Sequence, residues 1–136
     1  MNIRVLPDDT DAFGRLNWRA YVRYCEEGEA GLMEMLGFSA ARFYKEQKIS
    51  LPRRAAAFEY LSPVYLENLI DLETTVKKIG KTCFTLSHTF FKKNSEAGER
   101  TLAAKAEVTV VAYNDQSHEK EELPTELLNA LRRIFC

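Results

Sequence analysis

The feature that most limits what this chain can fold into is a series of runs in which apolar and polar residues alternate. Three such runs cover residues 66–77, 82–92 and 102–112. A period of two is typical of a strand with one face buried and the other facing solvent. Gly80 and the NSEAG run at 94–98 lie between the runs and are turn signals. The pattern therefore predicts consecutive antiparallel strands joined by hairpins.

One long amphipathic helix is expected before these strands. Its apolar positions recur three, four and seven residues apart and are Trp18, Tyr21, Val22, Cys25, Leu32, Met33 and Leu36. Asn17 suits the N-cap position, and Gly37 suits the end of the helix. Small residues inside the helix, such as Gly28, permit close approach by another backbone. We expect this helix to pack on the sheet.

Shorter elements complete the predicted fold. Residues 2–6 form a short strand, the alanine-rich run 53–61 forms another, and residues 126–135 form a short surface helix. Residues 39–50 fit either a helix or a loop. The order of elements predicts an α+β fold with an antiparallel sheet of about five strands.

Length and charge exclude several classes of protein. The 136 residues fit one compact domain, and the net charge of −1 gives no basic excess for nucleic acid or a membrane surface. The start, MNIRVLPDD, lacks the apolar core of a secretory signal, so we expect a cytoplasmic protein. Three cysteines lie far apart without CxxC spacing, and we expect reduced structural thiols.

An acidic loop precedes the predicted helix and carries the first chemical signal. Asp8, Asp9 and Asp11 fall within four residues, and Gly14 turns the chain before the helix begins near Asn17. The first turn of a helix has unpaired N–H groups and a partial positive charge, which can polarise a carbonyl group. A carboxylate next to such a group suggests acyl chemistry. Asp8 and Asp9 are interpreted as turn residues.

Three further ionisable residues are placed by periodicity. At about 100° per residue, Glu29 falls inside the apolar stripe of the helix and Glu26 on its flank, so both are expected to be partly buried. For Glu29 a salt bridge or a water-filled interface is preferred to a catalytic role. His88 alternates with Phe84, Leu86 and Phe90, which favours a buried histidine on the sheet face over a catalytic one.

The segment DTDAFGRLNWRAYVRYCEE, together with the order of elements and the late LPTELLNAL, resembles a known enzyme family. It is similar to the hotdog-fold acyl-CoA thioesterases of the 4-hydroxybenzoyl-CoA thioesterase and YbgC-like type. Asp11, Gly14, Tyr21 and Glu26 stand at the matching places. The resemblance implies a sheet wrapped around a central helix, an acyl-CoA substrate, and a homodimer or homotetramer with its site where subunits meet. It implies no metal or redox cofactor.

The resemblance also implies roles for individual residues. Asp11 matches the catalytic carboxylate, acting as nucleophile or as base for a water, and the Trp18 N–H matches the group that holds the thioester oxygen. Glu26 matches a helix acid that supports the site. Substrate contacts are expected from the loop and helix at Phe13, Asn17 and Tyr21, and from residues near the CoA arm, which are Arg53, Arg54, Lys81 and Thr82.

Several alternatives stay open at this stage. Asp11 can be a loop or cap aspartate, and the four residues near the CoA arm can be solvated surface polar groups. Phe13 and Arg15 depart from the family pattern, which keeps open a non-catalytic hotdog module that binds acyl-CoA or an acyl carrier protein. A hotdog dehydratase ranks low, because neither His88 nor His118 lies near the loop or helix in sequence.

Overall fold

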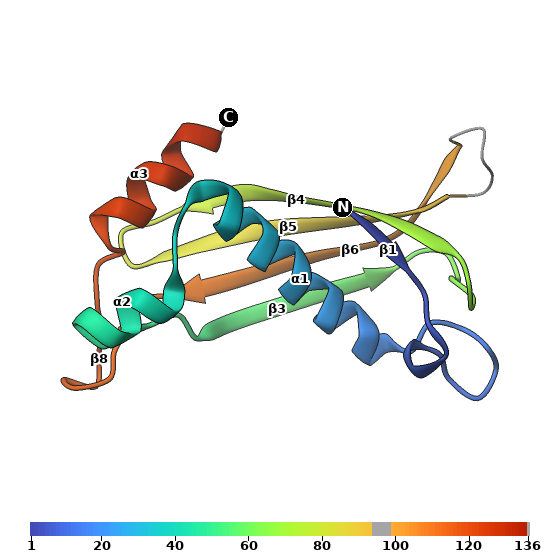
Figure 1. Ribbon diagram of the computed structural model, residues 1–136, viewed down its shortest axis with the longest axis horizontal. Coiled ribbons are helices and arrows are strands. Elements are labelled where there is room, and N and C mark those ends of the chain that lie inside the picture. Colours follow the sequence, from blue (N-terminus) through green and yellow to red (C-terminus); the bar gives the residue numbers. More distant parts are fainter. Residues whose placement is uncertain (94–98, 136) are drawn as a thin grey trace. The chain divides into compact units, whose positions relative to one another are not determined.

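A computed structural model describes residues 1–93 and 99–135 of the chain (Figure 1). In chain order its elements are β1 (Asn2–Arg4), the 3-10 helix η1 (Pro7–Asp9), α1 (Trp18–Leu36), α2 (Ala40–Gln47), β2 (Ile49–Ser50), β3 (Arg53–Tyr60), β4 (Leu69–Ile79), β5 (Cys83–Lys93), β6 (Arg100–Val111), β7 (Tyr113–Asn114), β8 (Glu119–Lys120) and α3 (Thr125–Ile134). The predicted turn at 94–98 lies outside the described residues.

The main sheet is the predicted antiparallel sheet of five strands, in the order β1-β4-β5-β6-β3. From Cys83 to Phe91 of β5 the side chains alternate between half-buried and buried, with Phe84, Leu86, His88 and Phe90 buried. The turn at Gly80 closes the β4–β5 hairpin through a 2.7 Å hydrogen bond from its N–H to the Cys83 carbonyl. The period-two pattern thus predicted both the strands and their buried faces.

Helix α1 starts and stops where the sequence indicated. Asn17 immediately precedes it, and its Oδ1 accepts the Arg19 N–H at 3.0 Å, so it is the N-cap residue. Gly37 follows the last turn with φ of +71°, a left-handed conformation that glycine adopts without strain. No helix among the described residues is long and apolar enough to cross a membrane.

The chain divides into two compact units, each with its own core. The first comprises residues 1–29, 58–74 and 88–106, and the second residues 30–57, 75–87 and 107–136. In the first unit, Tyr21 and Tyr24 of α1 are buried with Ile70, Leu72 and Phe90 of the sheet. In the second unit, the last turns of α1 share a core with β4, β5, β6 and α3. In both units, therefore, α1 packs on the sheet as predicted.

Gly28 is a position where α1 closely approaches the sheet in the first unit. A Cβ atom at this position would lie 2.4 Å from Thr74 Oγ1, 3.0 Å from Leu72 Cδ2 and 3.3 Å from His88 Nδ1. Such distances leave no space for a methyl group. The predicted close approach at a small helix residue is confirmed here.

The structure also differs from the sequence prediction in places. Residues 40–47 form α2, whose N-cap Ser39 accepts the Arg42 N–H, in the segment that sequence left open. Leu66 belongs to the turn before β4 and is exposed, because Tyr65 and Asn68 hydrogen-bond to each other and delay the strand to Leu69. The strand predicted by the alternating run 66–77 therefore begins at Leu69 and not at residue 66. The small sheet β2-β7-β8 was not predicted.

Candidate active site

A pocket of about 310 Å³ in the first unit contains the predicted acid and the start of the long helix. Its lining comes from the acidic loop, the first turn of α1, and the end of β3 with the segment that follows. The lining residues are Asp11, Arg15, Leu16, Trp18, Tyr21, Tyr60, Leu61, Ser62, Pro63 and Val64. Folding thus brings together three of the predicted site residues, Asp11, Trp18 and Tyr21.

Asp11 is held in a tight loop by its own carboxylate. Its Oδ1 accepts the N–H groups of Phe13 at 2.8 Å and Arg15 at 3.1 Å, and its N–H donates to the Arg15 carbonyl at 2.7 Å. Gly14 completes the turn with φ of +79°. The other carboxylate oxygen, Oδ2, has no hydrogen-bond partner in the described part of the chain. Asp11 is therefore a loop-shaping aspartate that still has one oxygen available at an exposed site.

Trp18, the first residue of α1, lines the same pocket and carries the first backbone donor of the helix. Within residues 1–93 and 99–135 the Trp18 N–H donates no hydrogen bond, whereas the Arg19 N–H is capped by Asn17. Unpaired first-turn N–H groups carry the positive end of the helix dipole. The Trp18 indole is 68% exposed, so its predicted place on the buried stripe is wrong, and Val22 is exposed too. Trp18 can therefore contribute an unpaired backbone N–H and an exposed aromatic side chain to ligand binding.

Aromatic rings form one wall of the pocket. Tyr21 and Tyr60 have ring centroids 5.1 Å apart, and Tyr21 makes an edge contact with Phe90 at 5.1 Å. Burial, followed by the nearby Tyr60 hydroxyl, raises the pKa of Tyr21 to about 12, so its phenol stays protonated at neutral pH. Sequence reasoning missed the segment 60–64. Its one signal was the placement of Tyr60 with Phe58 on one strand face.

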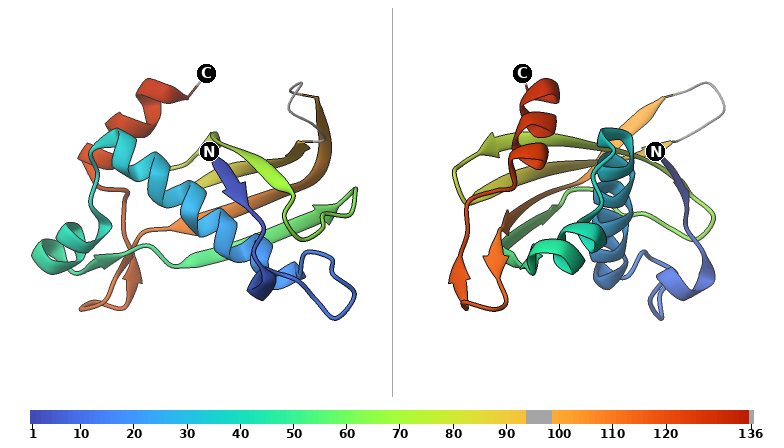
Figure 2. Two further views of the ribbon diagram at one scale, coloured as in Figure 1. Left: turned by 45° about the vertical axis from the view of Figure 1, so that its right-hand side comes forward. Right: turned by 60° about the vertical axis from the view of Figure 1, so that its left-hand side comes forward.

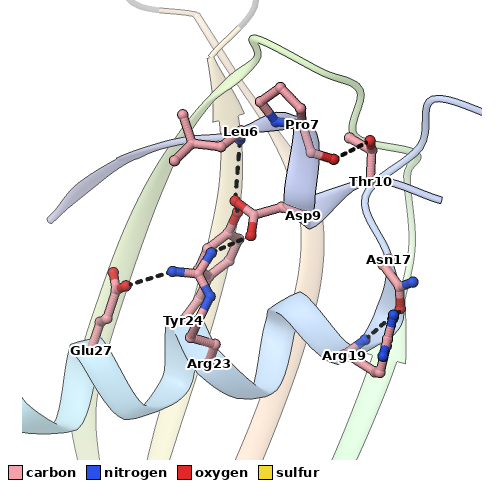
Figure 3. Close-up of polar contacts among 9 residues, drawn as sticks. All are labelled: Leu6, Pro7, Asp9, Thr10, Asn17, Arg19, Arg23, Tyr24 and Glu27. Atoms are coloured by element: carbon pink, nitrogen blue, oxygen red, sulfur yellow. Dashed lines mark hydrogen bonds and ion pairs between the residues drawn. The ribbon is translucent and has the colours of Figure 1, made fainter.

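A buried ionic cluster lies behind the loop (Figure 3). The Asp9 carboxylate accepts the Tyr24 hydroxyl at 2.8 Å and the Leu6 N–H at 3.1 Å, and it forms an ion pair with Arg23. Burial raises the pKa of Asp9, but hydrogen bonds from Tyr24, Leu6 and Arg23 outweigh it, so the pKa lies below the usual 3.8. Asp9 is thus a turn residue of η1, as interpreted from sequence, and is in addition a buried, partnered carboxylate, which the sequence did not indicate.

Other predicted residues of the loop and helix lie elsewhere on the first unit. Glu26 is exposed, so the expectation that it is partly buried is wrong, whereas Glu29 is half-buried as predicted. Phe13 is 84% exposed. Neither Glu26, Phe13 nor the capping residue Asn17 lines the Asp11 pocket in the described structure.

The four polar residues expected near CoA belong to the second unit. Arg53 and Arg54 begin β3, and the Arg53 guanidinium donates to the Leu51 carbonyl at 2.7 Å. Lys81 lines a pocket of about 560 Å³, whose other residues are Ile79, Gly80, Glu122, Leu123, Thr125, Leu128, Arg132 and Phe135. Thr82 follows Lys81 in the β4–β5 turn and is half-buried.

Two potentially reactive side chains are buried away from the pocket lining. His88 is 1% exposed and its Nδ1 lies 2.9 Å from Thr74 Oγ1, which confirms a buried histidine on the sheet face. Folding does bring it beside Gly28 of α1. Burial, followed by the charges of Glu29 and Glu26, raises the pKa of the Cys25 thiol to about 12. Cys25 is therefore a protonated structural thiol at neutral pH.

A pocket lined by a loop aspartate, the first residue of a helix and two tyrosines is suited to carbonyl chemistry, and comparison with known proteins agrees. The family model described as the Thioesterase-like superfamily matches residues 5–131. The chain belongs to this superfamily. A 1,4-dihydroxy-2-naphthoyl-CoA hydrolase of Rippkaea orientalis is 24% identical over 124 residues, covering 91% of this chain and 88% of that protein.

Further relatives and solved structures are consistent with this family. The acyl-CoA thioester hydrolase YbgC of Escherichia coli O6:H1 is 25% identical, covering 93% of this chain and 90% of its own. The 4-hydroxybenzoyl-CoA thioesterase of Pseudomonas sp. strain CBS-3 superposes with a TM-score of 0.85 at 19% identity, covering 96% of each chain. A 1,4-dihydroxy-2-naphthoyl-CoA thioesterase of Synechocystis gives 0.86 at 17%, covering 97% and 93%. The fold is the predicted hotdog fold.

Proposed function

We propose that this protein is an acyl-CoA thioesterase that hydrolyses an acyl-CoA to the free acid and CoA. The observation that carries the proposal is the pocket of the first unit, in which Asp11 and the first-turn residues Trp18 and Tyr21 line one cavity. The superfamily match over residues 5–131 supports the reaction class, as do the names of the relatives.

In the proposed reaction, the Trp18 N–H binds the thioester oxygen while Asp11 acts at the carbonyl carbon. The donor becomes more valuable as negative charge develops on that oxygen, and one such donor contributes roughly 3 kcal/mol in the transition state. Asp11 Oδ1 keeps the loop closed, and Oδ2 either attacks the carbon or removes a proton from the attacking water. The tetrahedral intermediate then expels CoA as thiolate. If water attacked, the free acid is formed in this step. If Asp11 attacked, water must next hydrolyse the mixed anhydride to release the acid and restore the carboxylate.

We further propose that the acyl group is aromatic. Trp18, Tyr21 and Tyr60 line the pocket, and flat aromatic groups stack well between such rings. Relatives named for hydroxynaphthoyl-CoA and hydroxybenzoyl-CoA support this substrate class. Phe13 and Asn17 are proposed to contact the substrate when the protein is assembled, and Glu26 to support the site.

Residues of the second unit are proposed to bind the CoA phosphates. Arg53, Arg54, Lys81 and Thr82 supply cationic or hydrogen-bonding groups, and the first three are exposed. Cationic and hydroxyl side chains are suited to phosphate oxygens.

The protein is proposed to work as a homodimer or homotetramer. β3 is an edge strand of the main sheet, and every one of its residues is exposed except the half-buried Phe58. An exposed alanine-rich edge is a surface on which a second copy can pair. Size-exclusion chromatography with light scattering measures the subunit number.

Further aspects of the proposal come from sequence. Residues 1–136 are proposed to act as one thioesterase domain, which the match over residues 5–131 supports. A cytoplasmic location, a reaction without metal or redox cofactor, and the absence of nucleic-acid or membrane partners stay predictions. Unchanged turnover after dialysis against EDTA would support the metal-free reaction.

The decisive experiment compares the wild type with Asp11→Asn in a thiol-release assay on aromatic and aliphatic acyl-CoAs. An asparagine Oδ1 can still accept the Phe13 and Arg15 N–H groups, so the loop should be retained. We expect hydrolysis to fall by about 100- to 10,000-fold. Asp8→Asn, an equal charge change at an exposed neighbour, is the matched control and should stay within about twofold, as surface changes usually do.

A binding module without catalysis predicts a different result. In that case a folded wild type would release no thiol from any acyl-CoA, while wild type and Asp11→Asn would bind acyl-CoA equally well by calorimetry. If the wild type hydrolyses a substrate and Asp11→Asn is equally active, the role of Asp11 is wrong and the enzyme uses another group.

Rapid-quench kinetics separates the two possible roles of Asp11. A nucleophilic carboxylate forms a mixed anhydride, so CoA release can precede acid release as a burst. A general base releases CoA and acid together in each turnover.

A further inference from the structure

The buried ionic cluster behind the loop is not used by the chemistry described so far. It contains Asp9, which is 6% exposed, and its three partners Leu6, Arg23 and Tyr24 (Figure 3). Arg23 is in turn held by Glu27 at 3.1 Å, one helical turn further along α1, and its guanidinium lies over the Tyr24 ring at 5.0 Å. Removing any one of these donors should destabilise the folded protein, because it leaves part of the negative charge of a buried carboxylate uncompensated.

Asp9 also ties the loop to the helix through its backbone. Its carbonyl accepts the Asn17 N–H at 2.7 Å, so the chain from Asp9 to the N-cap is closed into a loop. Asp11 lies inside this loop, which both views of Figure 2 show running from η1 into α1. The Asp9 side chain anchors the same point to α1 at Arg23 and Tyr24. Both ends of the Asp11 loop are thereby attached to the helix that presents the Trp18 N–H.

We propose that Asp9, held by Tyr24 and Arg23, is a positioning residue that fixes the Asp11 carboxylate relative to the Trp18 N–H. The inference rests on the proposed function, because it concerns the same reaction. Asp9 does not line the pocket in the described residues, so it acts through the loop and not on substrate. In the proposed reaction the Asp11 carboxylate acts at the carbon of the thioester carbonyl while the Trp18 N–H binds its oxygen, so the two groups must be correctly spaced. A displacement of about 1 Å between such groups can lower turnover by as much as 100-fold.

The test measures kcat and KM for Asp9→Asn and Tyr24→Phe, each made alone and combined with Asp11→Asn. Asp9→Asn keeps the shape but removes the charge, and Tyr24→Phe keeps the buried ring but removes the hydroxyl donor. We expect kcat to fall by about 10- to 100-fold in Asp9→Asn and less in Tyr24→Phe, with KM changed by less than about threefold. Thr85→Val, which removes the Thr85–Thr109 hydroxyl pair of the second unit, is the control for lost stability alone.

The combined variants separate positioning from simple support of the fold. If Asp9 acts through Asp11, Asp9→Asn should lower the residual rate of Asp11→Asn by less than about twofold, since coupled residues are not additive. An equal loss in both backgrounds, or no loss of kcat in either Asp9→Asn or Tyr24→Phe, would overturn the inference. An Asp11→Asn variant as active as wild type would instead contradict the proposed catalytic role. If Asp9→Asn does not fold, the Tyr24→Phe cycle decides alone.

Discussion

The pocket of the first unit and the pocket of the second unit differ in both size and lining. The first, about 310 Å³, is lined by three aromatic residues with Asp11 and Arg15, whereas the second, about 560 Å³, is lined by one aromatic residue, Phe135, and by aliphatic residues with Lys81 and Arg132. Glu122 also lines the second pocket, so a carboxylate alone does not distinguish the two. Rings suit a flat acyl group, and exposed cations suit phosphates.

The largest expected effect tests whether the first pocket carries out the reaction, and it comes from removing one backbone donor, the Trp18 N–H. Trp18→Pro deletes the N–H, yet proline is favoured at the first helical position, so α1 should still form. We expect kcat to fall by about 100- to 1,000-fold, as for loss of an oxyanion donor. Trp18→Ala retains the N–H and should mainly raise KM. Equal losses of kcat in the two variants would mean that the ring, and not the amide, is what matters.

Charge removal in the second pocket provides the matching experiment. Glu122→Gln should leave kcat within about twofold, because surface substitutions rarely have larger effects. Lys81→Ala should raise KM for an acyl-CoA by about threefold to fivefold, the worth of an exposed charge contact. The same variant should leave KM for an acyl-pantetheine unchanged, since that substrate lacks the nucleotide. Lys78→Ala, an exposed lysine outside the pocket lining, is the control.

Substrate preference tests whether the aromatic residues of the first pocket select the acyl group. Tyr60→Leu removes one ring of the first pocket while keeping an apolar side chain of similar length. We expect kcat/KM for an aromatic acyl-CoA to fall about threefold to tenfold more than for an aliphatic one, the value of an aromatic pair. A uniform loss on both substrates would show that Tyr60 supports the fold and does not select the acyl group.

The smallest expected effect concerns stability at acid pH. The pKa of Asp9 is lowered in the folded protein, so its ionised form contributes stability above about pH 4, and this contribution is lost as the pH falls through the folded value. Urea unfolding should show Asp9→Asn less stable than wild type by about 1 kcal/mol at pH 6. The gap should close below pH 3.8. A gap that is constant with pH would mean that the charge of Asp9 does not stabilise the fold.

Much of the fold could be predicted because it depends on local pattern. Alternation identified the buried face of β5, and the pair Asn17 and Gly37 marked the ends of α1. Asp11 and Trp18 could also be placed together, since only the loop's turn separates them in sequence. Periodicity could not predict burial of a polar side chain when that burial depends on partners from another element. Asp9 is buried by donors from a helix that begins nine residues later.

The remaining residues of the site are far in sequence from the acidic loop and α1. Tyr60 and the segment to Val64 reach Tyr21 only through sheet pairing, and no motif in that segment indicates chemistry. Periodicity was also misleading for Trp18 and Glu26, because an angle on a helical wheel does not tell where the neighbouring sheet ends. Both side chains are exposed in the first unit.

The lack of space at Gly28 also has an evolutionary consequence. A methyl group there would lie 2.4 Å from Thr74 Oγ1, so a larger residue at position 28 requires a smaller residue at position 74. The two positions should therefore vary together among related proteins, with alanine at the first accompanied by glycine or alanine at the second. In the laboratory, Gly28→Ala should be rescued by Thr74→Gly, which makes the pair a ready measure of how tightly helix and sheet are coupled.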